Sequence, residues 1–184
     1  MLKKNLLVAL IAGSVACTLQ PVYADVNLRI DPINMIIGSY KADLEIELSQ
    51  GYTLSPTFTY HESGNFIFRD REGFALGLRA NKYFSNTAYK GIFVSGELRY
   101  VDMETSSSHL FRPQTTGDAT GFEMDLMVGY SWLWESFNMS LAGGVLLNTF
   151  GEIEEKDASG DFVHINDEFE DPEAKIEYSL GWVF

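Results

Sequence analysis

Hydrophobic and polar residues alternate with a period of two along most of the chain. Between Gly38 and Leu48 the even-numbered residues after the glycine are apolar, whereas the odd-numbered residues are polar or charged. The segment from Gly121 to Trp132 repeats this alternation. Successive side chains of a β-strand point to opposite faces, so each stretch predicts a strand with one apolar face. Helical spacing with capping residues is nowhere comparable, and the chain is predicted to be all-β.

Weaker copies of the same alternation predict the remaining strands. They lie at Tyr52 to Glu62, Gly73 to Lys82, Gly91 to Val101, Phe137 to Asn148 and Lys175 to Phe184. Val26, Leu28 and Ile30 also alternate and predict one more, short strand. Bacterial single-chain barrels have even strand numbers, so we count eight strands. The segment from Asp31 to Ile37 leaves little room for a turn plus a full crossing, and we expect a kinked strand extension or a short plug there.

The connections between the predicted strands alternate in length. Short connections lie at Ser49 to Gly51, Tyr83 to Lys90 and Leu133 to Ser136, and long ones at Ser63 to Glu72, Asp102 to Thr120 and Thr149 to Glu173. This asymmetry is typical of an antiparallel up-and-down transmembrane β-barrel of the bacterial outer membrane, with short periplasmic turns and longer external loops. It also predicts a periplasmic C-terminus.

Aromatic residues fall at both predicted membrane boundaries. Near the periplasmic side these are Tyr83, Phe84, Tyr89, Trp132, Trp134, Phe137, Trp182 and Phe184, and near the outer side Tyr60, Phe74, Tyr100 and Phe122. Aromatic girdles at both interfaces are a property of transmembrane barrels. A soluble up-and-down barrel such as a lipocalin also alternates, but it keeps its apolar face inside and requires neither girdles nor loop asymmetry.

The energy of exposing charge to lipid decides which face of the strands points inward. The polar face carries eleven ionisable residues: Lys41, Asp43, Glu45, Glu47, Arg79, Glu97, Arg99, Glu123, Asp125, Lys175 and Glu177. A Lys or Arg at the bilayer midplane costs about 2 to 4 kcal/mol, so this face must point inward. An eight-stranded barrel is just wide enough for its own side chains. We therefore expect a packed polar lumen that is sealed by a charged network, and a wide pore is disfavoured.

The predicted lumen contains four cations and seven carboxylates. Some carboxylates must therefore share protons, pair with His61 or face water at the barrel mouths. Our hypothesis is that Arg79 and Arg99 anchor the network, since one guanidinium can bridge two carboxylates. The hypothesis predicts that Arg99→Met lowers the heat resistance of the folded barrel.

Residues 1–24 have the pattern of a secretory signal peptide, which places the barrel domain at residues 25–184. Lys3 and Lys4 precede an apolar run, and Val22, Tyr23 and Ala24 form a small-residue cleavage site. Lipidation at Cys17 is the alternative. Cleavage after residue 24 removes this one cysteine and takes the formal charge from −13 to −15. Such an acidic chain is not expected to bind nucleic acid, and a cysteine-free one has no disulfide or thiol nucleophile.

The closing sequence "KIEYSLGWVF" resembles the C-terminal signature strand of Gram-negative outer-membrane barrels. The matching residues are Tyr178, Leu180, Trp182 and Phe184. The resemblance implies a small eight-stranded barrel in the cell outer membrane, in contact with lipid and lipopolysaccharide, whose last strand is read by the barrel-assembly machinery. The stretch "NMIIGSYKADLEIELSQGYTLSPTFTY" is similar to the first hairpin of a family of such barrels with no assigned activity. Pro56 departs from the pattern, and we expect a local bulge there.

Some small barrels of this kind are enzymes that modify lipid A, and the histidines test this possibility. A lipid A deacylase uses a His and a Ser two residues apart on a lipid-facing strand. His61 and Ser63 have this spacing, but their parity points them into the lumen or a loop. His109 and His164 lie in predicted loops. The histidines are therefore interpreted as loop or mouth residues, and no catalytic residue is assigned.

The connection from Thr149 to Glu173 is strongly acidic, with ten carboxylates and one lysine. Its residues Asp157, Ser159, Asp161 and Glu168 fall at positions 1, 3, 5 and 12 of a calcium-loop spacing. Position 6 is Phe162 where glycine is needed, so the match is weak. A solvated charged loop is one interpretation, and loose binding of divalent cations that bridge lipopolysaccharide phosphates is the other.

The sequence contains no phosphate-binding glycine loop, Cys/His metal cluster or cofactor motif. We therefore expect no cofactor and favour a structural or surface-interaction role for the barrel. A lipid A modifying enzyme and a narrow gated channel are the alternatives.

Overall fold

The computed structural model describes residues 25–36, 38–62, 70–107, 115–156, 162–165 and 172–184. The predicted signal peptide, residues 1–24, lies outside the described residues. The elements are β1 (Val26–Ile30), α2 (Pro32–Ile36), β2 (Ser39–Ser49), β3 (Tyr52–His61), β4 (Asp70–Tyr83), β5 (Gly91–Ser107), β6 (Thr115–Trp134), β7 (Phe137–Lys156), β8 (Phe162–Ile165) and β9 (Glu173–Val183).

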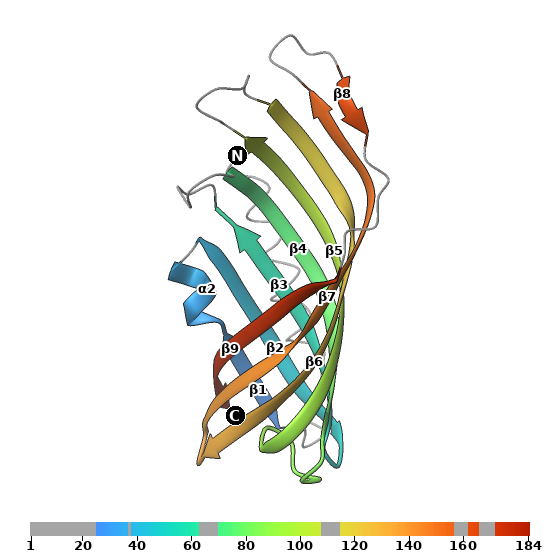
Figure 1. Ribbon diagram of the computed structural model, residues 1–184. Helices are drawn as coiled ribbons and strands as arrows, with labels where there is room; N and C mark the ends of the chain where they lie inside the picture. Colours follow the sequence, from blue (N-terminus) through green and yellow to red (C-terminus); the bar gives the residue numbers. More distant parts are fainter. Residues whose placement is uncertain (1–24, 37, 63–69, 108–114, 157–161, 166–171) are drawn as a thin grey trace.

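Eight of these strands close into an antiparallel barrel (Figure 1). Each strand from β1 to β7 pairs with the next, β7 pairs with β9, and β9 returns to β1. The short strand β8 pairs with β7 outside this ring. The all-β fold and the eight-stranded up-and-down barrel are therefore confirmed. Below, the "turn end" is the end with the β2–β3, β4–β5 and β6–β7 turns, and the "loop end" is the opposite one.

The predicted alternation separates the two sides of the barrel wall. On β4, for example, Leu78 is 50% exposed, whereas the next residue, Arg79, is 2% exposed. The same contrast separates Leu98 from Glu97 and Arg99 on β5. Apolar side chains thus face outward and ionisable ones inward, because a barrel has only these two faces and a period of two assigns each residue to one of them.

Two aromatic residues assigned to the girdle at the turn end lie in the lumen instead. Tyr83 and Tyr89 are both buried, and the Tyr83 ring packs against Phe93 with its centroid at 5.3 Å. Tyr83 shares the parity of Arg79, which explains its inward direction. Tyr89 lies in the β4–β5 turn, where strand parity does not apply. The exposed aromatic residues that remain at this end include Phe84, Trp134, Trp182 and Phe184.

The walls of the barrel differ in height. In Figure 1, β5, β6 and β7 continue well past the start of β9 toward the loop end. Ser107 and Thr115 are still paired, and β7 reaches Lys156. The long connections predicted at Asp102 to Thr120 and Thr149 to Glu173 are therefore shorter than expected, because the backbone ladder continues beyond the apolar alternation.

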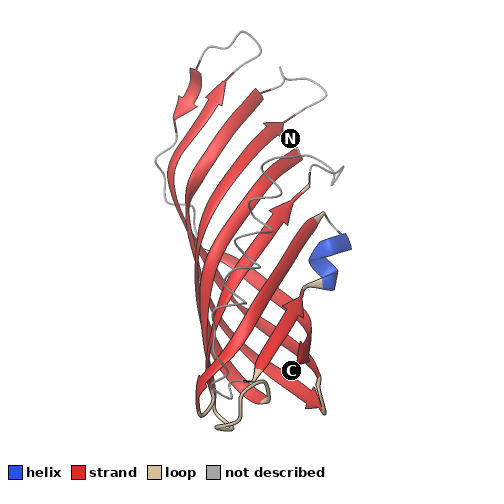
Figure 2. Cartoon of the chain, turned by 180° about the vertical axis from the view of Figure 1, so that it is seen from behind, coloured by secondary structure: helices blue, strands red, loops and turns tan. Residues whose placement is uncertain are grey.

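The first connection contains a helix rather than the expected strand extension or plug. Asp31 accepts hydrogen bonds at Oδ1 from the backbone N–H groups of Ile33 (3.1 Å) and Asn34 (3.0 Å). Asp31 is thus the N-cap of α2, and Pro32 occupies the first helical position. Figure 2 shows α2 at the edge of the wall, outside the barrel interior. At five residues, this helix is far below the length that spans a membrane.

Pro56 is accommodated without the expected bulge. The β3–β4 register runs through Pro56, which is opposite Leu78, with no shift. On the other side, the β2–β3 ladder is interrupted between the Asp43–Thr57 and Ile46–Leu54 pairs but resumes in the same register. The strand therefore forgoes local pairing with β2, since proline has no N–H to donate.

Candidate functional site

At mid-height in the lumen, one arginine and one lysine bridge two carboxylates. We call these four residues the central cluster: Lys41, Arg79, Glu97 and Glu177. Arg79 Nη2 lies 2.5 Å from Glu97 Oε2 and 2.7 Å from Glu177 Oε2, and its Nη1 lies 2.5 Å from Glu177 Oε1. One guanidinium therefore joins β4 to β5 and, across the lumen, to β9. This is the bidentate bridging that a planar guanidinium allows.

Lys41 bridges the same two carboxylates from β2. Its Nζ lies 3.0 Å from Glu97 Oε2 and 2.8 Å from Glu177 Oε2. Thr57 adds a neutral hydrogen bond of 2.7 Å to Glu97 Oε1. The central cluster is electrically neutral, and all four side chains are buried. Removing one partner from such a buried cluster is destabilising, because it leaves an uncompensated charge.

A second ion cluster, between the central cluster and the turn end, contains a cation that the sequence analysis missed. Arg29 on β1 binds Asp43 through Nε at 2.8 Å and lies 3.3 Å from Glu45 Oε2. The parity of Val26, Leu28 and Ile30 already placed residue 29 on the inner face.

Glu45 is held mainly by neutral donors. Its Oε1 accepts hydrogen bonds from Thr53 (2.6 Å), Asn81 (2.6 Å) and Tyr83 (2.9 Å), and its Oε2 accepts one from Asn27 (3.2 Å). This carboxylate is fully buried. The polar layer around it lies beside the apolar cluster of Tyr83, Phe93, Met127 and Ala142, so side chains fill the lumen at this level.

Toward the loop end, Arg99 binds Glu123 and shares Asp125 with Lys175. Arg99 Nη2 lies 2.6 Å from Glu123 Oε2 and 3.4 Å from Asp125 Oδ2, and Lys175 also binds Asp125 Oδ2. The Lys175 side chain is 17% exposed, more than the charged side chains of the central cluster. The charged side chains of the lumen are thus more exposed to solvent toward the loop end.

Two glycines make room for arginine side chains in the lumen. A Cβ on Gly77 would lie 2.5 Å from Arg99 Cγ, and one on Gly181 would lie 2.7 Å from Arg29 Cγ. Both glycines are directly opposite the arginine that they accommodate. The absence of a side chain at each facing position therefore leaves room for Arg99 and for Arg29.

The β4–β5 turn folds over the barrel mouth at the turn end. Tyr89 donates a hydrogen bond to the carbonyl of Asp25, while its own carbonyl accepts from Ser131 Oγ (2.6 Å) and Asn138 Nδ2 (2.9 Å). Its backbone has a φ of 63°, a strained value for tyrosine that these contacts maintain. Burial raises the pKa of the Tyr89 hydroxyl, and the nearby carboxylate of Glu45 raises it further.

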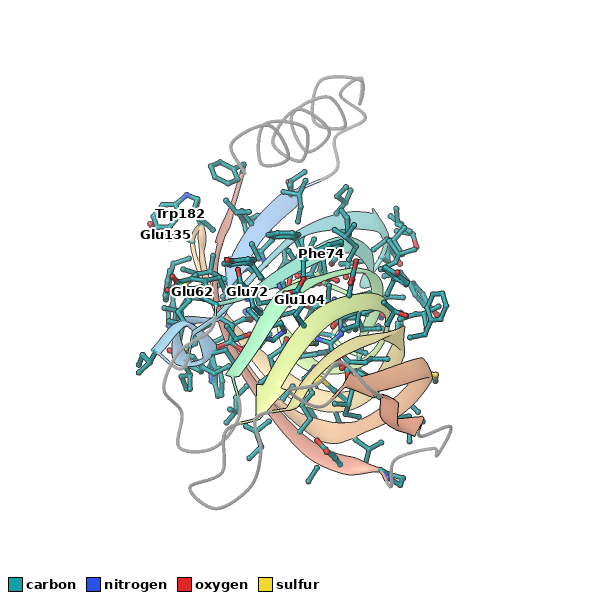
Figure 3. All side chains as sticks on the ribbon, turned by 90° about the horizontal axis from the view of Figure 1, so that it is seen from above. Glu62, Glu72, Phe74, Glu104, Glu135 and Trp182 are labelled. Atoms are coloured by element: carbon teal, nitrogen blue, oxygen red, sulfur yellow. The ribbon has the colours of Figure 1, made fainter. Side chains whose placement is uncertain are left out.

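A row of carboxylates lies on the outer surface near the loop end. Glu72 on β4 is directly opposite Glu104 on β5. Glu62 follows His61, the last residue of β3, which pairs with Gly73 next to Glu72 (Figure 3). All three side chains are exposed. Opposed like charges are tolerable in water but not in hydrocarbon, so this row marks where an apolar environment must end.

The remaining predicted site residues lie apart from the clusters or outside the described structure. Glu47 is half-buried at the turn end, near Tyr89. His61 is the last residue of β3, and His164 lies in β8. Ser63, His109 and the calcium-loop candidates Asp157, Ser159, Asp161 and Glu168 lie outside the described residues. Within the described segments, no group of three or more potential metal ligands comes together.

Comparison with known proteins adds little to this geometry. No protein-family model matches the chain, and no curated protein matches it. A solved structure, the crystal structure of Neisserial surface protein A (NspA), is similar over 87% of this chain and 92% of its own, with 11% sequence identity and a TM-score of 0.41. A likeness this distant carries no argument about function, and the eight-stranded barrel rests on the strand pairings described above.

Proposed function

We propose that this chain is an outer-membrane barrel with a structural or surface-interaction role, whose lumen is sealed by its charged network. One observation carries the membrane placement: the outward face of β4 is apolar from Phe74 to Ala80, between Glu72 and Lys82. At roughly 3.3 Å per residue the ten-residue step from Glu72 to Lys82 is about 33 Å long, and a strand tilt of about 40° reduces the height between these two charges to about 25 Å. An apolar band of about 25 Å is what outer-membrane barrels present to lipid.

The rest of the outer wall supports the same placement. Leu126 and Val128 on β6, Leu98 on β5 and Leu141 on β7 are exposed apolar residues around the barrel. Their exposed apolar surface is far more continuous than a soluble monomer presents to water. Two aromatic pairs, Tyr40 with Tyr60 and Tyr100 with Phe122, lie toward the loop end of this band.

The sealing of the lumen is supported by its side-chain packing. The Tyr89 turn, the layer around Glu45 and the central cluster succeed one another along the barrel axis. Each fills the lumen with buried, hydrogen-bonded groups. Moving an ion through them would require breaking several charge-assisted hydrogen bonds at once.

The proposed partners follow from this placement. They are outer-membrane lipid and lipopolysaccharide around the wall, and the barrel-assembly machinery at the closing residues Tyr178, Leu180, Trp182 and Phe184. Export by residues 1–24, loose divalent cations at the acidic connection and membership in a barrel family without assigned activity remain predictions.

Planar-bilayer conductance tests the sealed lumen. The wild-type protein is expected to show no steady conductance. A variant with alanine at Tyr89, Asn81 and Arg79, which removes one group from each of the three layers, is expected to conduct. Steady conductance of the wild type at neutral pH would instead support the narrow-channel alternative.

Two further measurements test the membrane placement and the enzyme alternative. The folded barrel is expected to require detergent or lipid for solubility, and a freely soluble folded form would contradict the proposal. Mass spectrometry of lipid A from cells with and without the protein is expected to show the same species. A changed acyl or phosphate pattern would support a lipid A modifying enzyme.

A further inference from the structure

One strand of the barrel is much shorter than the others. β1 pairs with β2 over Val26–Ile30, and with β9 only where Asn27–Ile30 meet Leu180–Val183. After Ile30 the chain enters α2 and does not continue toward the loop end. Among the described residues, no strand therefore pairs with the β1-facing edge of β9 from Glu173 to Ser179. We call this gap, between β2 and β9 on the loop side of β1, the seam.

The opposite edge of β9 shows what the seam lacks. There β9 pairs with β7 without interruption, from Glu173 opposite Leu146 to Trp182 opposite Phe137. A continuous ladder joins neighbouring strands by many backbone hydrogen bonds that must break together. On the β2 side, the last backbone hydrogen bond before the seam joins β2 to the residue that follows β1. The N–H of Asp31 donates it to the carbonyl of Lys41, at 3.2 Å.

An ion pair takes the place of the ladder on the lumen side of the seam. Lys41 on β2 and Glu177 on β9 are joined by their 2.8 Å contact, and both are buried. When Lys41 moves away, Arg79 still holds both Glu177 oxygens. The seam can therefore lose this contact without leaving the carboxylate of Glu177 unpaired.

The outer side of the seam is apolar. α2 contacts both β2 and β9 and so covers the gap. Its Ile33 and Ile36 side chains are 55% and 84% exposed, and Ile176 on β9 is 77% exposed. A five-residue helix has little stability of its own, since helix formation is cooperative and needs a longer chain. The charged lumen is thus separated from lipid here by one short helix and one ion pair.

We propose that the seam is a lateral gate, closed by the Lys41–Glu177 ion pair and by α2, through which the anionic headgroup of an outer-leaflet lipid reaches the lumen. The inference rests on the membrane placement proposed above. Regions held by few cooperative contacts open locally at a low cost in free energy. In the open gate an anionic headgroup replaces Glu177 as the partner of Lys41, while its acyl chains remain beside Ile33, Ile36 and Ile176.

Labelling of a cysteine behind the seam tests the gate. Thr59→Cys lies inward beside Lys41 in the β2–β3 register, at a buried side chain whose hydroxyl has no hydrogen-bond partner among the described residues. The mature chain has no other cysteine if residues 1–24 are removed. The probe is a phospholipid with a maleimide on its headgroup, in vesicles of phosphatidylethanolamine and phosphatidylglycerol.

The gate predicts that Lys41→Met raises the labelling rate of Thr59→Cys at least tenfold. Lys41→Arg, which keeps the charge, is expected to leave it unchanged. Lys175→Met is the matched control. The Lys175–Asp125 pair connects β9 to β6, and these two strands are already held together by the backbone ladders that each forms with β7. It is expected to change the rate less than twofold. Equal acceleration in both methionine variants, or in neither, would overturn the gate.

A reference cysteine separates failure of the gate from failure of the membrane placement. Tyr100→Cys lies on the outward face of β5 toward the loop end of the apolar band, where lipid headgroups reach it whenever the wall contacts lipid. Labelled Tyr100→Cys with unchanged Thr59→Cys contradicts the gate alone, whereas an unlabelled Tyr100→Cys contradicts both proposals. Rapid labelling of Thr59→Cys by a water-soluble maleimide but not by the lipid probe shows entry through the mouth and also contradicts the gate.

Hydrogen exchange tests the seam in the wild-type protein, independently of the variants. Between Glu173 and Ser179, alternate amides of β9 face β7 and the seam. The seam-facing amides are expected to exchange at least a hundredfold faster in detergent micelles than the β7-facing amides. Equal protection of both sets would mean that the edge is closed, and the proposal would fall.

Discussion

The β5–β6–β7 wall and the β2–β1–β9 seam close the same barrel with different interactions. In the wall, β5 pairs with β6 along Gly91–Ser107, and β6 pairs with β7 along Thr116–Trp134. At the seam, β1 offers only the short segment Val26–Ile30. Backbone hydrogen bonds therefore hold the wall, whereas buried side chains hold much of the seam.

This difference separates what each region tolerates. A backbone ladder does not depend on which side chains it carries, so the wall can change sequence if it keeps its alternation. The seam depends on specific charges, because Lys41, Arg79 and Glu177 join strands that no ladder connects. Substitutions in the lumen should therefore matter most where they reach β9 across the seam.

The largest effect is expected for Arg79→Met. This change leaves Glu97 and Glu177 with one shared lysine and should lower the free energy of unfolding by about 3 to 5 kcal/mol, as for other broken buried ion pairs. Urea unfolding in detergent micelles, followed by tryptophan fluorescence, measures it. Arg79→Lys keeps the charge and is the control, with a smaller loss expected. A loss below 1 kcal/mol for Arg79→Met would show that the central cluster does not stabilise the barrel.

A charge on the outward face distinguishes the wall from the helix at the seam. Leu126→Arg, in the middle of the outward face of β6, is expected to cost about 2 to 4 kcal/mol, because it places a cation in hydrocarbon. Ile36 on α2 lies two residues before Gly38, whose carbonyl accepts the N–H of Glu62 in the carboxylate row, so this position is at the loop-end edge of the apolar band. Ile36→Arg is therefore expected to cost under about 1 kcal/mol. The same unfolding assay compares them, with Leu126→Ala and Ile36→Ala as size controls. Equal costs at the two positions would contradict the assigned membrane level of α2.

Arg99→Met is expected to destabilise the barrel less than Arg79→Met. Asp125 keeps Lys175 as a partner and Glu123 is near the wetter loop end, so a loss of roughly 2 kcal/mol is expected. The temperature at which the folded barrel loses its distinct electrophoretic mobility should fall accordingly. If Arg99→Met has the larger effect of the two, the wall depends on lumen charges more than the seam does.

The smallest effect is expected at the turn end. Tyr89→Phe removes one hydrogen bond, to the carbonyl of Asp25, and should cost about 1 kcal/mol. Because the pKa of Tyr89 is raised in the folded protein, its contribution is complete below the unfolded value of about 10 and decreases as the pH rises above it. Unfolding at pH 8 and pH 11 should show a difference between wild type and Tyr89→Phe that shrinks at the higher pH. A constant difference would mean that Tyr89 does not titrate with folding.

Much of the wall could be predicted from the sequence, because a strand offers only two faces and the charges decide between them. On β4, for example, the alternation of apolar Leu78 with charged Arg79 is sufficient to assign the outward and the inward face. The strand ends were not predictable in the same way, since the ladder between Ser107 and Thr115 rests on backbone bonds and has no apolar signature. Asp31 and Pro32, in contrast, form a helix-start signal that would have predicted α2.

Which lumen charges pair with one another could not be predicted from the sequence. Lys41 and Glu177 are 136 residues apart and meet only because the barrel closes with a particular stagger between β1 and β9. Parity assigns a side chain to the lumen but not to a height in it. Tyr89 illustrates the same limit, because a turn that folds back into the mouth leaves no periodic pattern.

The junction of Val26 and Phe184 has a consequence for engineering. Each residue donates its backbone N–H to the carbonyl of the other, at 3.4 and 2.9 Å, so the two ends of the barrel domain meet beside its short hairpin turns. A brief peptide linker between them would create a fourth such turn, and new termini could then be cut at a long connection on the other side. Circular permutants of this design would move the chain ends from one end of the barrel to the other while every strand keeps its neighbours.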